Sequence, residues 1–249
     1  MTFRLIFACV FSILPLSTVI AQDWSYEFEP YILASSIEGD SRTGRTQGVD
    51  VDVNFGDILE VLDTGLMGHF EAQSDTGWGL VLDYGYMDLR DDIAGPRGGV
   101  ASVRVRQGVL EALVTRRSSN NDALEYFAGV RWWDNDLDLR VDPAILPGTP
   151  ATGINVDWVD IVFGARLNRE ISDQWSMQLR GDVGGFGIEA DFTSTVSIGF
   201  RRTISDRFDL NLQYKATWVD YEQGTPGQAG YYLYDTVTHG PQVGLAIKF

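Results

Sequence analysis

Apolar and polar side chains alternate with a period of two residues along much of the chain. The pattern is clearest at residues 207–221, where the apolar positions are Phe208, Leu210, Leu212, Tyr214, Ala216 and Trp218. A period of two places successive side chains on opposite faces of a β-strand. The last residues alternate in the same way and end on Phe249. An aromatic end is typical of the strand that closes a bacterial outer-membrane barrel, and we assign it that role.

Ten segments carry this alternation and predict strands at residues 24–37, 65–73, 78–89, 100–116, 123–139, 157–168, 174–188, 192–203, 207–221 and a last one that starts near 231 and ends at 249. Short turns and longer loops alternate between them, as in outer-membrane barrels with tight periplasmic turns and longer outer loops. The predicted fold is one antiparallel transmembrane β-barrel of ten strands, with twelve or eight as alternatives. The alternation slips near Gln107 and Gly108, which a β-bulge there would explain.

Residues 38–64 form the longest polar stretch. Within it, residues 49–55 alternate like a short strand, and residues 57–63 suit one or two helical turns. We interpret the stretch as a structured outer loop or as a plug folded into the lumen.

The tryptophans offer an independent test of the barrel. Three fall at the predicted periplasmic ends of strands and three near the outer ends, respectively Trp24, Trp78 and Trp175, and Trp132, Trp158 and Trp218. A bilayer favours two such aromatic girdles, one at each interface.

The first residues predict a signal peptide, because Arg4 precedes an apolar run at residues 5–20. We expect cleavage after Ala21, export to the bacterial outer membrane, and a barrel formed by residues 22–249. Cys9, the one cysteine, lies in this leader. The exported chain would therefore hold no disulfide and no cysteine-ligated metal.

The charge balance excludes one class of partner. The chain has 19 basic and 35 acidic residues, for a net charge of −16, which argues against nucleic-acid binding. Mean hydropathy is near zero and no run suits a membrane helix apart from the short leader. A barrel remains compatible with this composition, because alternation dilutes its lipid-facing residues.

The polar faces of the predicted strands carry charges of both signs. The acids expected to point inward are Glu71, Asp83, Glu111, Glu125, Asp160, Asp182 and Asp209. We predict a lumen network of His69, Glu71, Asp83, Glu125, Arg131, Arg166, Arg180, Asp182, Arg201 and Lys215. A ten-stranded lumen is narrow, and unpaired burial of charge is costly. The main hypothesis is a salt-bridged core, and a narrow solute path along the network is the alternative.

Residue patterns for catalysis, metals or cofactors are weak, and we predict none of the three. His69 and His239 are the two histidines, and His69 has Glu71 but no serine near it on its own strand. The acidic residues at 50–57 lack the glycine and glutamate positions of an EF-hand. The glycine-rich residues 181–187 lie within a predicted strand, so they do not form a phosphate loop.

Three segments carry a family resemblance: Val53-Asn-Phe-Gly-Asp-Ile-Leu59, Arg180-Gly-Asp-Val-Gly-Gly-Phe-Gly187 and Gly240-Pro-Gln-Val-Gly-Leu-Ala-Ile-Lys-Phe249. The chain resembles small outer-membrane barrels of the OmpA/OmpW-like kind, and more narrowly a largely uncharacterised family of bacterial outer-membrane β-barrels. The resemblance implies fold and location, and it supplies no catalytic residues.

The resulting functional hypothesis is a structural or interaction barrel with a salt-bridged lumen. A narrow porin-like channel and a surface ligand-binding or adhesin barrel are the alternatives, and enzyme activity is not expected. We expect the partners to be outer-membrane lipids and, through the strand that ends at Phe249, the barrel-assembly machinery.

Overall fold

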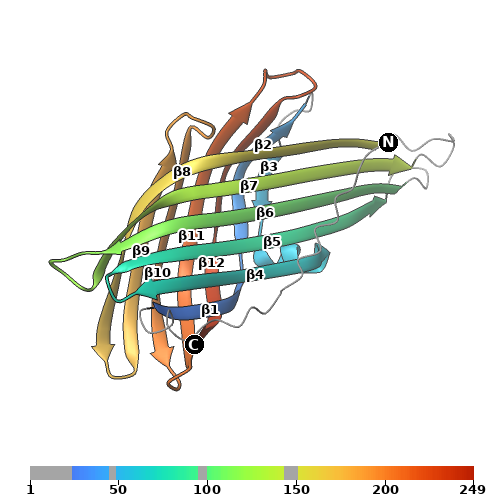
Figure 1. Cartoon of the computed structure of the whole chain (residues 1–249). Coiled ribbons are helices and arrows are strands. Elements are labelled where there is room, and N and C mark those ends of the chain that lie inside the picture. The colour runs from blue at the N-terminus through green and yellow to red at the C-terminus, as the bar shows by residue number, and fades with distance from the viewer. Residues whose placement is uncertain (1–23, 45–48, 95–99, 143–150) are drawn as a thin grey trace, which may run out of the picture.

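The computed structural model describes residues 24–44, 49–94, 100–142 and 151–249 as one antiparallel sheet that curls into a barrel (Figure 1). The strands that close the barrel are β1 (Trp24–Leu33), β4 (Leu62–Ser74), β5 (Trp78–Ala94), β6 (Val100–Arg117), β7 (Leu124–Asp142), β8 (Ala151–Ser172), β9 (Trp175–Gly185), β10 (Phe192–Thr203), β11 (Phe208–Gln223) and β12 (Tyr232–Lys248). Each pairs with the next, and β12 pairs with β1 from Lys248 opposite Glu27 to Gln242 opposite Leu33. The prediction of a transmembrane barrel of ten strands is confirmed.

Two further strands extend one side of the wall. β2 (Ser36–Thr43) pairs with the half of β12 that β1 leaves free, and β3 (Val49–Val53) pairs with β2. The first predicted strand is therefore divided into β1 and β2. The short strand predicted at residues 49–55 corresponds to β3.

One helix, α1 (Phe55–Val61), follows β3, close to the helical turns expected at residues 57–63. Asn54 caps it, because its side chain accepts hydrogen bonds from the backbone N–H groups of Gly56 and Asp57 while the Asp57 carboxylate accepts from the Asn54 N–H. This capping box stabilises a helix too short to persist alone. No helix among the described residues is long and apolar enough to cross a membrane.

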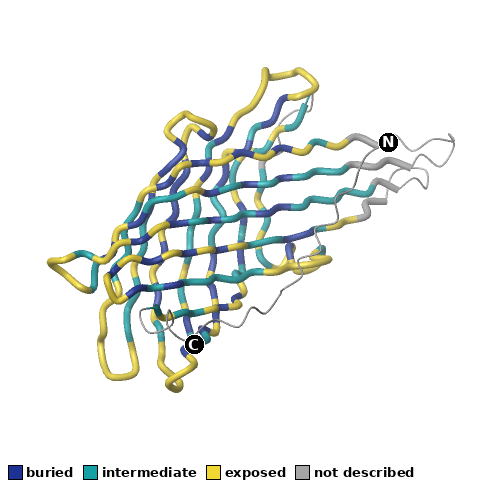
Figure 2. Tube along the Cα trace, viewed as in Figure 1, coloured by how far each residue is buried: buried dark blue, intermediate teal, exposed yellow. Residues whose placement is uncertain are grey.

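The two faces of the wall differ as the alternation predicts. On β10, Val196 and Ile198 are 44% and 51% exposed, whereas Ser197 between them is 7% exposed. Figure 2 shows a similar alternation of buried and exposed residues along parts of several other strands. The exposed side chains form an apolar belt around the barrel, which suits lipid contact. Ion pairs on the outside, such as Arg104 with Asp88 at 2.5 Å, lie beyond the belt.

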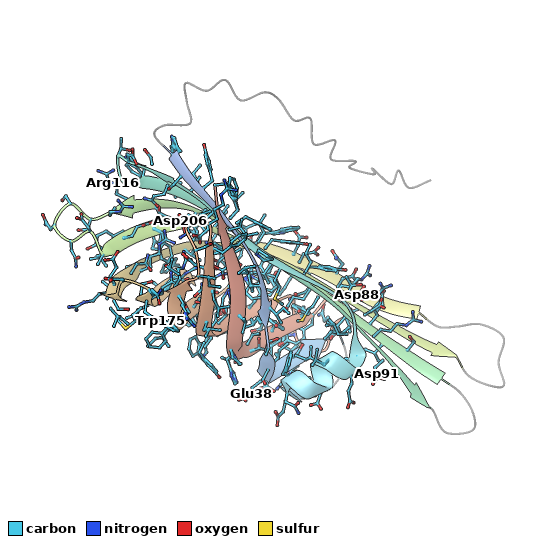
Figure 3. The ribbon with its side chains drawn as sticks, turned by 90° about the horizontal axis from the view of Figure 1, so that it is seen from below. Glu38, Asp88, Asp91, Arg116, Trp175 and Asp206 are labelled. Carbon is cyan, nitrogen blue, oxygen red and sulfur yellow. The ribbon has the colours of Figure 1, made fainter. Side chains whose placement is uncertain are left out.

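The two ends of the barrel are unlike (Figure 3). Arg116, Trp175 and Asp206 mark the end with the short turns, and Asp88 and Asp91 lie at the opposite end near α1. The first and last strands meet at the short-turn end, where the backbones of Tyr26 and Phe249 exchange hydrogen bonds of 3.0 and 3.2 Å. Short turns are typical of the periplasmic end of an outer-membrane barrel.

Three sequence-based expectations are wrong in detail. The register runs without a shift through Gln107 and Gly108, so no bulge lies there; shifts occur instead between Leu62 and Thr64 and between Glu170 and Ser172. Trp158 is 2% exposed and points into the barrel, so it does not belong to the outer girdle. Height along a strand places a residue near an interface, but the parity of its position decides which face it occupies.

The predicted strand at residues 174–188 also ends early, at Gly185. Gly185, Phe186 and Gly187 have φ values of 86°, 58° and 67°, which take the backbone out of the extended conformation and into a turn. The predicted leader, the loop glycines at 95–99 and the prolines at 143–150 lie outside the described residues.

An arginine on the lipid face tests the belt. Ile198→Arg, in the middle of β10, should lower the free energy of unfolding by about 2–4 kcal/mol, because the charge must enter the hydrocarbon core. Ile171→Arg, equally exposed at the short-turn end, should cost at most about 1 kcal/mol. Denaturant titration in lipid vesicles measures both values. Equal small losses would show that the exposed apolar face does not contact lipid.

Candidate functional site

All ten residues of the predicted lumen network point into the barrel. Arg131, Asp182 and Glu125 are buried. The other seven line a polar cavity of about 490 Å³ at the short-turn end of the lumen: His69, Glu71, Asp83, Arg166, Arg180, Arg201 and Lys215. Their strands surround the lumen, so the barrel brings together side chains that are far apart in the sequence.

Arg131 is the centre of a charged layer that spans the lumen. Its guanidinium is 1% exposed, lies 2.5 Å from the Glu111 carboxylate on β6 and donates to both carboxylate oxygens of Asp182 on β9 at 3.0 Å. It also donates to the hydroxyls of Thr193 and Thr195 at 2.9 Å. Arg180 lies 2.8 Å from Glu111 and 3.0 Å from Asp182. Two arginines thus alternate with two carboxylates, which compensates the cost of burying charge.

A second group of charges joins opposite walls. Arg166 on β8 donates to both carboxylate oxygens of Glu71 on β4, one of them at 2.7 Å, and to Glu125 at 3.0 Å. His69 lies beside Glu71, with its Nδ1 2.9 Å from Asp83 and its Nε2 3.6 Å from Glu71. The hydrogen bonds between Arg166 and Glu71 stabilise the shape of the barrel's cross-section, because β4 and β8 are fixed to each other across the lumen as well as to their neighbours in the sheet.

A third group lies nearer the short-turn end. Arg201 on β10 donates to Glu27 on β1 at 2.8 Å and lies 3.6 Å from Glu29, and Lys248 lies 2.9 Å from Asp209. Lys215 borders the same polar cavity, but no carboxylate of the described residues lies within 4.0 Å of its ammonium. Nine of the ten predicted residues are therefore in direct ionic contact, and the tenth, Lys215, borders the cavity without such a contact.

A layer of aromatic side chains lies nearer the long-loop end than the charges do, and sequence analysis did not predict it. Trp158 stacks on Tyr221 with ring centroids 4.0 Å apart and on Trp133 at 5.6 Å, and Tyr232 stacks on Tyr234 at 6.3 Å. The amide of Gln107 on β6 donates to the Tyr234 hydroxyl on β12 at 2.9 Å. The alternation along the strands could have predicted this layer. Trp133 and Trp158 are each next to a residue on the outward face, so their own side chains must point inward.

The charged side chains of the lumen can bind polar groups, and their ion pairs join strands across the lumen. Both ring nitrogens of His69 face carboxylates, and its hydrogen-bond and ionic partners among the described residues include no nucleophilic hydroxyl or thiol. Among the described residues, no group of three or more histidine, cysteine, aspartate or glutamate side chains is arranged to hold a metal ion.

The fold and its two faces define a β-barrel of the outer-membrane type. The translocator domain of the autotransporter NalP from Neisseria meningitidis is similar, with a TM-score of 0.51, 10% identity, and 93% of this chain and 90% of that chain covered. The outer-membrane protease OmpT from Escherichia coli is similar with a TM-score of 0.54, 8% identity, and coverage of 92% and 98%.

A scan against protein-family models and a search of curated proteins each found no match. At these identities the likeness to solved structures shows the fold alone. One similar barrel is a protease and the other a translocator domain, so the shared fold does not settle an activity.

Removing the central guanidinium tests the charged layer. Arg131→Met should lower the free energy of unfolding by about 3–5 kcal/mol, because Glu111 and Asp182 lose their buried partner. Arg106→Met removes the outside ion pair with Asp136 and should cost at most about 1 kcal/mol, since the two side chains are 33% and 26% exposed. Denaturant titration in vesicles measures both. Replacing Asp182 by Asn as well should recover part of the loss, because Glu111 then stays paired with Arg180.

Proposed function

We propose that the protein is a bacterial outer-membrane barrel of the structural or interaction type, closed to solutes by its own side chains. The observation that carries the proposal is the Arg131 layer. A fully buried guanidinium with partners on β6, β9 and β10 leaves no aqueous gap at its own position. The aromatic layer blocks the lumen a second time, nearer the long-loop end.

The long strands support an interaction role. β5 to β8 have 17, 18, 19 and 22 residues, whereas a tilted strand needs about 9–11 to cross the hydrocarbon core. β9 and β10, with 11 and 12 residues, have little to spare. One side of the barrel therefore projects beyond the apolar belt (Figure 1). Its outward ion pairs, Arg104 with Asp88 and Arg106 with Asp136, suit a surface in water.

The proposed partners follow from these surfaces. The apolar belt would contact outer-membrane lipids, and the closing strand, ending at Phe249, would be the element that the barrel-assembly machinery recognises. A narrow channel is the alternative, and it would require the charged and aromatic layers to open together.

Conductance in planar bilayers tests the closed lumen. The wild-type barrel should give no resolved steps above baseline, because two layers of side chains cross the lumen. Arg131→Ala with Arg180→Ala should also stay closed, since the aromatic layer remains. Adding Trp133→Ala, Trp158→Ala and Tyr234→Ala should produce discrete steps.

Wild-type steps of defined size would contradict the closed barrel and favour the channel. Each variant needs a parallel check that it is folded and inserted, such as resistance to protease in vesicles. A folded five-residue variant without conductance would show that other groups close the lumen.

A further inference from the structure

The barrel wall has a gap between its first two neighbouring strands. Pairing between β1 and β4 ends at Pro30 opposite Gly68. Beyond this point, residues 31–33 of β1 pair with β12, and residues 62–67 of β4 pair with β5. Proline lacks a backbone N–H and commonly ends a ladder. We call the separation between residues 31–33 and residues 62–67 the seam.

Helix α1 covers the part of the seam nearest the long-loop end. Ile58 is 4% exposed and packs with Ile37 of β2 and Met87 of β5. Figures 1 and 3 both place α1 between the β2–β3 pair and the β4–β5 pair. The two walls are thus joined here by side-chain packing instead of a hydrogen-bond ladder.

Two adjoining cavities lie behind the seam. The first, of about 90 Å³, is lined by Tyr31 and Leu33 from one edge of the seam and by Met67 from the other, and it also borders the charged layer at Glu111 and Arg131. The second, of about 200 Å³, lies under α1, against Ile58 and Val53. Both are lined by Met87 and by Gln107, so together they lead from the wall to the helix.

The cavity under α1 is lined mainly by hydrocarbon. Ile37, Val51, Leu89, Val105, Leu137 and Ile154 line it together with two tyrosines. A polar solute would lose its hydration there without replacing most of its hydrogen bonds. The two volumes together approach the lower end of the range for ligand pockets, about 300 Å³. They suit one slender apolar chain.

The seam lies at the level of the lipid-facing belt. Its outward neighbours are Ile32 and Leu66, which are 69% and 63% exposed, among the most exposed large apolar side chains of the barrel. A hydrocarbon chain that moves from the belt into the seam would therefore not cross water. Such a chain gains no hydrophobic free energy, because it leaves an apolar solvent; the gain comes from closer dispersion contacts with the apolar cavity walls.

We propose that the seam admits one acyl chain of a membrane lipid, which inserts sideways and occupies the cavities up to α1. The first cavity borders the charged layer at Glu111 and Arg131, but the proposal goes beyond a closed lumen, since the acyl chain neither needs nor opens an aqueous path. Met87, which lines both cavities, and Ile58 would contact the chain directly.

Photolabelling from inside the bilayer tests the proposal. The full barrel is reconstituted in nanodiscs of phosphatidylcholine that carries a diazirine near the end of one acyl chain. After illumination, mass spectrometry should find adducts on inward-facing Met87, Ile58 and Val53 as well as on outward-facing Leu80 and Leu82. Because neighbouring strand residues face opposite sides, the labelled positions separate the cavity from the belt.

Filling the cavity provides the matched comparison. Met87→Trp should lower labelling of Ile58 and Val53 at least tenfold, whereas Leu82→Trp on the lipid face should leave it unchanged. If Met87→Trp does not fold, Val53→Trp takes its place, and labelling is then measured at Ile58 and Met87. The labelling pattern of the wild-type barrel decides the question even without either variant.

Adducts confined to outward positions would overturn the proposal. A parallel sample receives a short water-soluble alkyl diazirine in unlabelled lipid. Inward labelling by that probe, without inward labelling from the lipid, would also overturn it, because the site would then take a soluble apolar molecule from the mouth of the barrel.

Discussion

The whole structure depends on one constraint: a backbone inside hydrocarbon must satisfy its hydrogen bonds internally. Pairing of β12 with β1 meets this requirement by closing the sheet, so the belt has no free edge over most of its height. The seam is where closure is incomplete. There the burial of Ile58 against Ile37 and Met87 takes the place of backbone pairing. A packed contact holds two walls together but excludes apolar molecules less strictly than a ladder does.

A closed wall with alternating side chains creates two environments, and each sets its own rule. Lipid outside accepts apolar side chains and rejects charge. Inside, the charges that alternation directs into a narrow lumen must find partners, and Arg131 is held by Glu111, Asp182 and two threonines. The same bonds that satisfy these groups also fill the space. Charge pairing and the filling of the lumen at the Arg131 layer therefore have one cause, and the aromatic layer adds stacking and hydrogen bonds that cross the lumen, such as that from Gln107 to Tyr234.

Local patterns were enough for several features. Period two placed Arg131, Asp182 and Glu71 inside, and the turn residues separated all ten strands of the barrel. Three other features were not predicted in this way. Trp158 was assigned to a girdle by height when parity places it inside, and the early end of β9 depends on the left-handed conformations of Gly185, Phe186 and Gly187. Arg166 meets Glu71 across 95 positions of sequence, a contact set by strand tilt and stagger.

The sequence alone determined that the chain forms a two-faced antiparallel barrel, because side-chain direction in a strand depends on nothing beyond position parity. It also determined which charges enter the lumen. Tertiary structure decided how those charges pair, that tryptophans and tyrosines gather in a second layer, and that β1 and β4 separate after Pro30 to create the seam. Those outcomes depend on the relative stagger of strands and on where β2, β3 and α1 lie against the wall, and no local pattern specifies either one.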